Sequence, residues 1–232
     1  MLFRSWRSTP RTAEIQARRE SWRREVAETQ SDSGKPIHPA RLLAELSKAL
    51  PADAIAVTDV GWNKNGAGQQ LLTQVPRNFL TSGGMATMGF APAAAIGAKL
   101  GAPDRKVVCL VGDGGLTSVI GALTTAVELN IPVLWVVFNN FCFSTIRTVG
   151  TTYFQNAYAT EFSRPDGTPY NPDFQLLAKS FGIESRLVEE PGDLGQQCAK
   201  LASLDTVSAP TVAALTKAAG TDGTVGLECG VA

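Results

Sequence analysis

The strongest constraint on the fold is a series of short, continuously apolar segments separated by stretches with helical spacing. The clearest of these segments are residues 106–111 (KVVCLV) and 133–138 (VLWVVF), which have the length of strands and are too short to span a bilayer. Continuously apolar strands are typical of parallel sheets, because helices cover both faces of such sheets. We therefore predict an α/β fold: a doubly wound, mostly parallel sheet of about six strands with helices on both faces.

The other elements follow from the same patterns of apolar spacing and turn residues. Further strands are predicted at residues 54–58, 186–188 and 210–215. Helices are predicted at residues 41–50, 91–100, 117–130, 174–181 and 194–204. For helix 174–181, Asn171 is the predicted N-cap, with Pro172 at the first helical position.

Composition argues against several classes of protein. Of the 232 residues, 44% are hydrophobic and 18% are charged, which is enough apolar material for a packed core. The 21 basic and 21 acidic residues balance, so the charge does not favour nucleic acid as a partner. The four cysteines are scattered without a CxxC pair, which argues against a zinc site and fits a reducing, cytoplasmic compartment. His38, the only histidine, precedes Pro39 and is expected to start a helix rather than to act in catalysis.

The two ends of the chain differ from its middle. The first 25 residues carry seven arginines and three glutamates. They predict a solvated linker helix with Trp6, Ile15 and Trp22 as apolar contacts, or alternatively a targeting peptide for import into an organelle. A polar segment at residues 31–36 marks a boundary. The expected parts are a linker helix and connector at residues 1–37, one main domain at 38–216 and a loose tail at 217–232.

Polar or glycine-rich breaks directly follow three of the predicted strands. They are Asp59-Val60-Gly61, residues 112–115 (GDGG) and Asn139-Asn140. Ligands of open parallel sheets bind beyond the carboxyl ends of the strands, and a right-handed crossover brings Asp113 and Asn140 to the same edge. Their carboxylate and amide oxygens suit Mg²⁺, and the glycines let backbone N–H groups approach an anion. The pattern predicts a diphosphate held through a metal ion. The chain has no GxxxxGKS/T motif, which excludes a P-loop, and no GxGxxG motif to support a dinucleotide site.

Three motifs occur in order along the chain. They are Thr58-Asp59-Val60-Gly61, residues 82–90 (SGGMATMGF), and Gly112-Asp113-Gly114 followed after a crossover by Asn139-Asn140. The last of these resembles the signature of thiamine-diphosphate-dependent enzymes, and the first two resemble the acetolactate-synthase group. The resemblance covers about residues 38–215. It implies the C-terminal domain of a 2-oxo-acid decarboxylase or carboligase, a lyase or transferase that uses thiamine diphosphate and Mg²⁺.

The resemblance also implies a role for each matching residue. Mg²⁺ would be bound by Asp113, by the Asn140 side chain and by the backbone carbonyl of Cys142, whose thiol would take no part. Backbone groups of Ala86 and Met88 would bind the aminopyrimidine. The Met88 side chain would support the bent cofactor, unless it only packs in the core, as methionine commonly does. The residues that would surround the diphosphate are Val60, Gly61, Trp62, Asn63, Gly112, Gly114, Gly115, Phe143, Ser144, Thr145 and Ile146.

The group that activates the cofactor is expected outside this chain. In the family that the chain resembles, a glutamate on a separate pyrimidine-binding domain has this role, and residues 1–37 leave no room for such a domain. We therefore expect a fragment, or one subunit of a split enzyme, that is inactive alone. The complete enzyme is expected to be a dimer or tetramer that acts on small 2-oxo acids. The alternatives are a non-catalytic cofactor-binding paralogue and a nucleotide-binding α/β domain that uses residues 112–115 as a phosphate loop.

Three departures from the acetolactate-synthase pattern lie near the expected site. Ala86 replaces a common glycine, Trp62-Asn63-Lys64-Asn65 replaces Gln-His-Gln-Met, and Phe143-Ser144 replaces an aromatic or leucine residue followed by glycine. These positions adjoin the diphosphate and the substrate entrance. They put the identity of the substrate in doubt rather than the cofactor.

Overall fold

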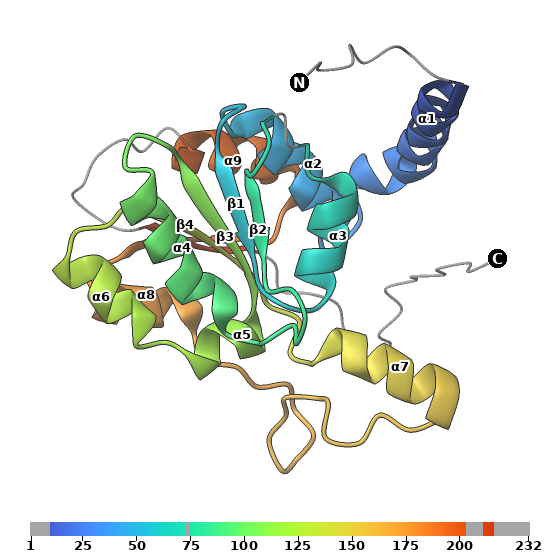
Figure 1. The fold of residues 1–232 in the computed structure, drawn as a ribbon. Coiled ribbons are helices and arrows are strands. Elements are labelled where there is room, and N and C mark those ends of the chain that lie inside the picture. Colours follow the sequence, from blue (N-terminus) through green and yellow to red (C-terminus); the bar gives the residue numbers. More distant parts are fainter. Residues whose placement is uncertain (1–9, 73–74, 203–210, 216–232) are drawn as a thin grey trace.

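The computed structural model describes residues 10–72, 75–202 and 211–215. Within this part of the chain, six strands form one parallel sheet with the order β2-β1-β3-β4-β6-β5 (Figure 1). The strands are β1 (Ile55–Thr58), β2 (Phe79–Thr81), β3 (Val107–Gly112), β4 (Leu134–Phe138), β5 (Glu184–Val188) and β6 (Thr211–Leu215). The predicted parallel α/β fold is therefore confirmed. The tail predicted at 217–232 lies outside the described residues.

The helices alternate with the strands along the chain. They are α1 (Pro10–Gln30), α2 (Pro39–Ala49), α3 (Trp62–Gln70), α4 (Phe90–Gly101), α5 (Asp113–Ser118), α6 (Ala122–Glu128), α7 (Ser144–Phe154), α8 (Phe174–Ser180) and α9 (Leu194–Ala202), with a short 3₁₀-helix, η1 (Pro191–Asp193), before α9. Helical crossovers of this kind connect parallel strands, because a tight turn cannot return the chain to the same end of the sheet.

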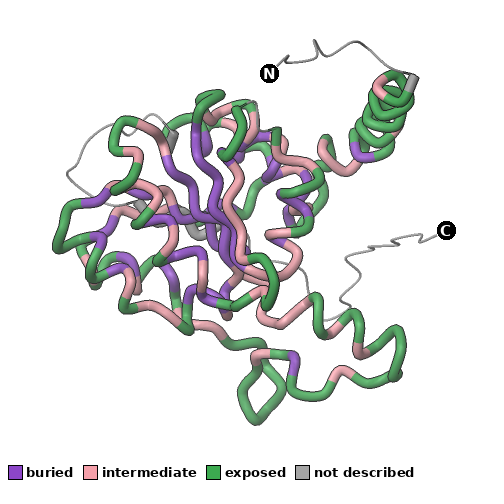
Figure 2. Tube along the Cα trace, in the orientation of Figure 1, coloured by how far each residue is buried: buried purple, intermediate pink, exposed green. Residues whose placement is uncertain are grey.

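Helices cover both faces of the sheet, as predicted. On one face, α4, α5, α6 and α8 pack with Val57 and Trp135 in one core cluster, and on the other face α2, α3 and α9 pack with Val108 and Val136. Successive residues of a strand point to opposite faces, so one continuous apolar run supplies both clusters. Figure 2 shows the buried strands at the centre of the molecule, between these helices. Burial of each valine, leucine or isoleucine side chain in these clusters contributes roughly 1.5–3 kcal/mol to the stability of the fold.

The direction of the chain across the sheet changes beside β1. From β1 the chain passes to β2 on one side, and it then returns to β3 on the other side of β1. Connections that lead away in opposite directions leave a crevice at the carboxyl ends of the two central strands. Gly61 and Asp113 follow those ends, so the fold places two of the three breaks at this crevice.

His38 caps the start of α2, as expected. The N-cap is His38, whose Nδ1 accepts a hydrogen bond of 3.1 Å from the backbone N–H of Ala40, and Pro39 occupies the first turn. Burial lowers the pKa of His38 below its ordinary value of 6.5, although the charge of Asp32 opposes the shift. Only the neutral imidazole has a nitrogen lone pair for this bond. The helix start therefore depends on the unprotonated ring.

Replacing His38 with alanine should lower the free energy of unfolding by about 1 kcal/mol at pH 7.5, the typical value of an N-cap. Because the folded pKa lies below 6.5, this contribution is complete above pH 6.5 and is lost as the pH falls through the folded pKa. Urea unfolding at pH 7.5 and pH 5 measures both effects. His38→Asn, which keeps a capping acceptor that does not titrate, should be less sensitive to pH than the wild type. An equal pH dependence of the two proteins would contradict the assignment.

Helix α1 confirms the predicted helix near the N-terminus. It has no apolar stripe, and two of its hydrogen bonds to the rest of the chain come from Trp22 and Gln30. Trp22 Nε1 donates a hydrogen bond of 3.4 Å to the Gln69 carbonyl, and Val26 is buried, whereas Ile15 is exposed. Trp6 lies outside the described residues. Neither α1 nor any other described helix is long and apolar enough to cross a membrane.

The helix predicted at 117–130 is wrong as a single element. Two shorter helices, α5 and α6, replace it, with a break at residues 119–121. At the break, Val119 has φ −135° and Gly121 is the N-cap of α6. Valine and glycine both disfavour a helical interior, and the earlier start of α5 at Asp113 uses the carboxylate as a local acceptor for Gly114 N–H.

The predicted N-cap of α8 is also wrong. Asp173 caps this helix, and its Oδ1 accepts hydrogen bonds of 2.9 Å from Gln175 N–H and 3.0 Å from Leu176 N–H. One aspartate satisfies two of the N–H groups that a helix start leaves without a partner. The side chain of Asn171 does not cap α8 and instead donates hydrogen bonds to Asp113 and Asn139.

Candidate functional site

Asp113 lies at the centre of the candidate site. It is the first residue of α5, directly after β3, and only 2% of it is exposed. Its Oδ2 accepts hydrogen bonds from the backbone N–H groups of Asn140 (3.0 Å) and Phe141 (2.7 Å) and from Asn171 Nδ2 (2.7 Å). Its Oδ1 accepts a bond of 2.8 Å from Gly114 N–H. The ends of β3 and β4 therefore meet at this carboxylate, where the sequence places Asp113 and Asn140.

The turn after β4 has a conformation that serves this contact. Phe141 has φ +57°, in the left-handed region that residues other than glycine seldom adopt. Holding such a residue costs about 1–3 kcal/mol and is typical of functional turns. An antiparallel bridge between Cys142 and Glu161 supports the turn, with bonds of 2.8 Å from Phe143 N–H to the Thr160 carbonyl and 2.7 Å from Phe162 N–H to the Phe141 carbonyl.

The oxygen atoms in this region have the character of ligands for Mg²⁺. Burial raises the pKa of Asp113, although four N–H groups donate to its carboxylate and oppose the shift. A nearby cation would favour the charged form. Asp113 Oδ1 accepts only from its neighbour Gly114, and among the described residues no hydrogen bond ends on the Cys142 carbonyl oxygen. A carboxylate, an amide and a free peptide carbonyl are a hard donor set, so the residues fit the metal.

The described residues contain no group of three or more His, Cys, Asp and Glu side chains that could hold a metal ion. The donor set at Asp113 differs from such a group, because two of its three members are an amide and a backbone carbonyl. The Cys142 thiol is a poor candidate for chemistry, since burial, helped by the charge of Asp113, raises its pKa to about 11. At neutral pH this thiol is protonated and weakly nucleophilic.

The glycines after β3 have two kinds of surroundings: aromatic rings contact Gly114, and open space lies beside Gly112. A Cβ on Gly114 would lie 2.8 Å from Phe143 Cε1 and 3.1 Å from Phe162 Cζ, whose rings form an edge-to-face pair with centroids 4.7 Å apart. A Cβ on Gly112 would meet nothing within 4 Å. A Cβ on Gly115 would press on Asp59 and the core. The space beside Gly112 is therefore where an anion can approach the backbone.

The loop after β1 brings two more predicted segments together. Gly61, with φ +108°, is the N-cap of α3, and a Cβ on it would lie 3.7 Å from Thr145 Oγ1, in the first turn of α7. The same Cβ position lies still closer, at 3.2 Å, to Asn63 Oδ1, so the Asn63 side chain reaches this junction. Trp62 packs near Phe138, with ring centroids 6.4 Å apart, and Asn63 Nδ2 donates a bond of 2.9 Å to the Leu110 carbonyl. Asn63 therefore contributes its side-chain oxygen to the junction, whereas the Trp62 ring packs near Phe138.

Asp59 has a structural role that the sequence patterns did not predict. It is 1% exposed, and it accepts hydrogen bonds from the backbone N–H groups of Val60 (2.8 Å), Gly89 (3.1 Å) and Ala91 (2.9 Å). The last two belong to the start of α4. Through hydrogen bonds to Gly89 and Ala91, Asp59 therefore holds the segment at residues 82–88 near the end of β1. A charged residue directly after an apolar strand is the sequence signal that could have indicated it.

The segment at residues 82–88 is open to solvent at the crevice. Met85 is 92% exposed and Met88 is 38% exposed, so Met88 does not pack in either core cluster. Ala86 has φ +47°, in the left-handed region, which explains physically why glycine is favoured at this position. Lys64 Nζ donates a bond of 3.4 Å to the Ser82 carbonyl and links the segment to α3.

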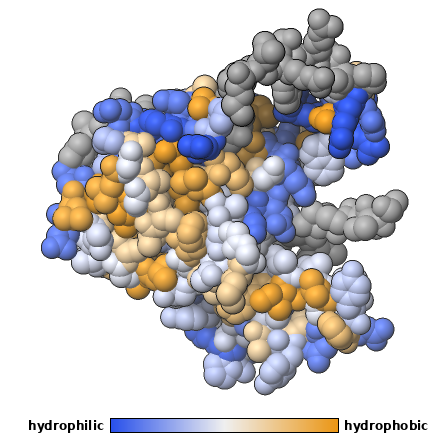
Figure 3. All heavy atoms as spheres, viewed as in Figure 1, coloured by the Kyte–Doolittle hydropathy of each residue, from blue (hydrophilic) through white to orange (hydrophobic). Residues whose placement is uncertain are grey.

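Helix α7 has an unusually exposed surface for its composition. None of its residues is buried, and Ile146, Val149, Tyr153 and Phe154 are exposed. Figure 1 shows α7 extending away from the sheet beside the candidate site, and Figure 3 shows hydrophobic side chains gathered over it. Contiguous apolar surface of this kind is typical of interaction sites for a protein, a membrane or a ligand.

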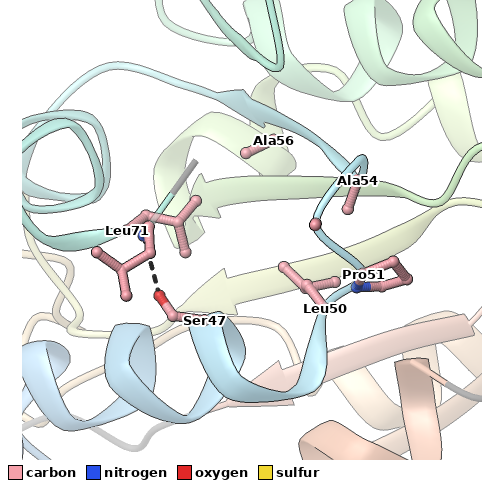
Figure 4. A pocket seen from close by; sticks show the side chains of 8 residues that line it. Ser47, Leu50, Pro51, Ala54, Ala56 and Leu71 are labelled. Atoms are coloured by element: carbon pink, nitrogen blue, oxygen red, sulfur yellow. Dashed lines mark hydrogen bonds between the residues drawn. The ribbon is translucent and has the colours of Figure 1, made fainter. Parts of the chain in front are cut away.

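A small pocket elsewhere in the fold has no such chemistry. It lies where α2, the start of β1 and the end of α3 meet, and Ser47 Oγ there accepts a bond of 3.2 Å from Leu72 N–H (Figure 4). Its lining residues are Ser47, Leu50, Pro51, Ala52, Ala54, Ala56, Leu71 and Leu72, none of which titrates near neutral pH.

Comparison with known proteins agrees with this geometry. The family model described as thiamine pyrophosphate enzyme, C-terminal TPP binding domain, matches residues 59–223. Thiamine pyrophosphate (TPP) is another name for thiamine diphosphate. The matched range contains the three breaks that follow β1, β3 and β4.

Individual relatives are longer than this chain. The "Probable acetolactate synthase large subunit" of Methanococcus aeolicus is 38% identical over 69% of this chain and 27% of the relative. The "Acetolactate synthase isozyme 2 large subunit" of Escherichia coli (strain K12) is 37% identical over 66% of this chain and 27% of the relative. The "Sulfoacetaldehyde acetyltransferase" of Castellaniella defragrans is 28% identical over 80% of this chain and 32% of the relative. The chain thus spans less than a third of the length of these relatives.

Proposed function

Because the chain belongs to the TPP enzyme family, as a C-terminal TPP-binding domain of the acetolactate-synthase type, we propose that it holds the diphosphate of TPP through Mg²⁺. Asp113, the Asn140 side chain and the Cys142 carbonyl would bind the metal. The observation that carries the proposal is the buried Asp113 carboxylate, with Oδ2 held by three donors and Oδ1 bonded only to Gly114 N–H. When bound, TPP supplies an electron sink for breaking or making a bond next to a carbonyl carbon.

The residues around the metal would bind the diphosphate mainly through their backbone. Open space at Gly112 and the approach of Gly61 to Thr145 support this part of the proposal. N–H groups at the first turns of α3 and α7 would donate to the diphosphate, because negative charge is favoured at a helix start. The Phe143–Phe162 pair covers Gly114 and would limit access of water to this end of the cofactor.

The segment at residues 82–88 would hold the other end of the cofactor. Ala86 and Met88 would bind the aminopyrimidine through backbone groups, and the Met88 side chain would support the bent conformation. The exposure of Met88 at the crevice and the anchoring of the segment by Asp59 support this assignment. The parts of the chain would be a linker helix and connector at 1–37 and the TPP domain at 38–216.

We further propose that a pyrimidine-binding domain, from another chain or from another part of a longer one, completes the site. Such a domain would carry the glutamate that activates the cofactor, and the complete enzyme would be an oligomer. The length of the relatives and the exposed apolar surface of α7 support this proposal. The reaction would be decarboxylation or carboligation of a small 2-oxo acid, with Trp62 and Ser144 among the residues that distinguish this chain from acetolactate synthases.

Calorimetric titration of the purified chain tests the proposed cofactor. We expect TPP to bind in the presence of Mg²⁺, weakly because the proposed partner domain is not part of the assay, and not in the presence of EDTA. ATP and NAD⁺, titrated under the same conditions, serve as controls for a nucleotide-binding fold. Binding of ATP or NAD⁺ without any response to TPP would contradict the proposal.

A second stage tests the need for a partner domain. The chain alone should not turn over pyruvate or other 2-oxo acids, because it lacks the activating glutamate. Mixing it with the pyrimidine-binding part of a relative tests whether activity can be restored. Robust decarboxylation by the chain alone would overturn the proposal that the site is incomplete.

A further inference from the structure

The side chain of Asn171 joins the ends of two strands at the candidate metal site. Its Nδ2 lies 2.7 Å from Asp113 Oδ2 and 2.6 Å from Asn139 Oδ1. Asp113 follows β3 and Asn139 follows β4, whereas Asn171 comes from the long connection between α7 and α8. One amide group therefore bridges three segments that are far apart in the sequence.

The orientation of this amide follows from its neighbours. An ionised carboxylate only accepts hydrogen bonds, so the group facing Asp113 Oδ2 at 2.7 Å must be the NH₂ of Asn171 and not its oxygen. The two hydrogens of that NH₂ match the two acceptors, Asp113 Oδ2 and Asn139 Oδ1. The partly buried position of the three groups strengthens bonds to the charged partner.

We propose that Asn171 is a positioning residue for the metal site, which orients the Asp113 carboxylate so that Oδ1 faces the cation. This inference rests on the proposed function. With Asn140 N–H and Phe141 N–H, the Asn171 amide gives Oδ2 three donors, while Oδ1 has only the adjacent Gly114 N–H. Partners that orient a metal ligand in this way commonly matter almost as much as the ligand.

The same segment contains a residue with a purely structural role, Asp173, which can be compared with Asn171. The start of α8 is capped by Asp173, and none of the hydrogen bonds at that cap involves the Asn171 side chain. Removing the Asp173 side chain should therefore weaken α8 without touching Asp113. Asp173→Ala is thus a matched control: it lies two positions away and affects stability but not the carboxylate.

The test compares Asn171→Leu with Asp173→Ala in the full 232-residue chain. Leucine has a similar size and no donor. For each protein, TPP is titrated at a series of Mg²⁺ concentrations to obtain the apparent Mg²⁺ affinity, and the melting temperature is measured without ligand. Asn171→Leu should weaken the apparent Mg²⁺ affinity by about 10- to 100-fold, the range for partners of metal ligands. Saturating Mg²⁺ should restore TPP binding. Asp173→Ala should lower the melting temperature and leave the Mg²⁺ affinity unchanged.

The outcomes separate this inference from the proposed function. If the wild type requires Mg²⁺ for TPP and Asn171→Leu has the same Mg²⁺ affinity, the positioning role is wrong and the proposed function stands. If Asp173→Ala weakens Mg²⁺ binding as much as Asn171→Leu does, the effect is structural and the inference is overturned. If the wild type does not bind TPP with Mg²⁺, both proposals fall. Should Asn171→Leu not fold, Asn171→Ser, which is too short to bridge both acceptors, replaces it with the same expected weakening.

Discussion

Replacing Asp113 with asparagine should abolish measurable Mg²⁺-dependent binding of TPP to the chain. The substitution keeps the shape of the side chain and removes its negative charge. The amide oxygen of asparagine would face the three donors at the Oδ2 position, which places its NH₂ group at the Oδ1 position, where it cannot bind a cation. Losing one partner of a buried charge interaction costs about 3–5 kcal/mol, which corresponds to a loss of at least about 100-fold in affinity. Calorimetry with TPP and Mg²⁺ measures it.

The matched control is Asp104→Asn, which makes the same chemical change at an exposed carboxylate. It should leave the affinity for TPP unchanged. Circular dichroism of both variants shows whether the fold is retained. Wild-type affinity in a folded Asp113→Asn protein would exclude Asp113 as the metal ligand, and binding that no longer depends on Mg²⁺ would point to a different diphosphate site.

Replacing Asp59 with alanine should be among the most destabilising single changes in the described part of the chain. Its carboxylate satisfies three backbone N–H groups in a buried position, those of Val60, Gly89 and Ala91. A buried donor without a partner costs about 1–3 kcal/mol, and the variant leaves two such donors at the start of α4. The free energy of unfolding should therefore fall by about 3 kcal/mol, as measured by urea denaturation.

Asp53→Ala provides the comparison, since Asp53 is an exposed aspartate just before β1. It should change the free energy of unfolding by less than about 0.5 kcal/mol. Asp59→Ala should also make residues 82–89 more accessible to limited proteolysis, because Gly89 loses its anchor. A loss of stability below about 1 kcal/mol would show that water replaces the carboxylate at these donors.

Asp113 and Asp59 have different roles at the candidate site. Among the described residues, Asp113 Oδ1 accepts only from the adjacent Gly114 N–H and would bind the metal, whereas Asp59 uses both oxygens within the protein. Both follow central strands of the sheet, β3 and β1, at the point where the strand order reverses. The same sheet edge thus carries a group for the ligand and a group that holds the ligand-binding segment.

The elements that were missed from the sequence are those with weak apolar patterns. Strand β2 has three residues at the edge of the sheet, α3 carries two glycines, and α7 has no buried residue. Edge strands and exposed helices are stabilised by neighbours or by partners more than by their own spacing. By contrast, β3 and β4 are almost entirely buried, and their predicted bounds differ from the structure by at most one residue at each end.

The sequence alone determined the parallel α/β class, the family and the pairing of Asp113 with Asn140, because long apolar runs and short motifs are local properties of the chain. Only the tertiary structure decided which groups surround that pair. Asn171 was expected to cap a helix, and it instead donates to Asp113 from 58 positions along the chain. Asp59 reaches Ala91 across 32 positions. Hydrogen bonds between distant segments depend on how the strand ends converge, and no local pattern of residues specifies that geometry.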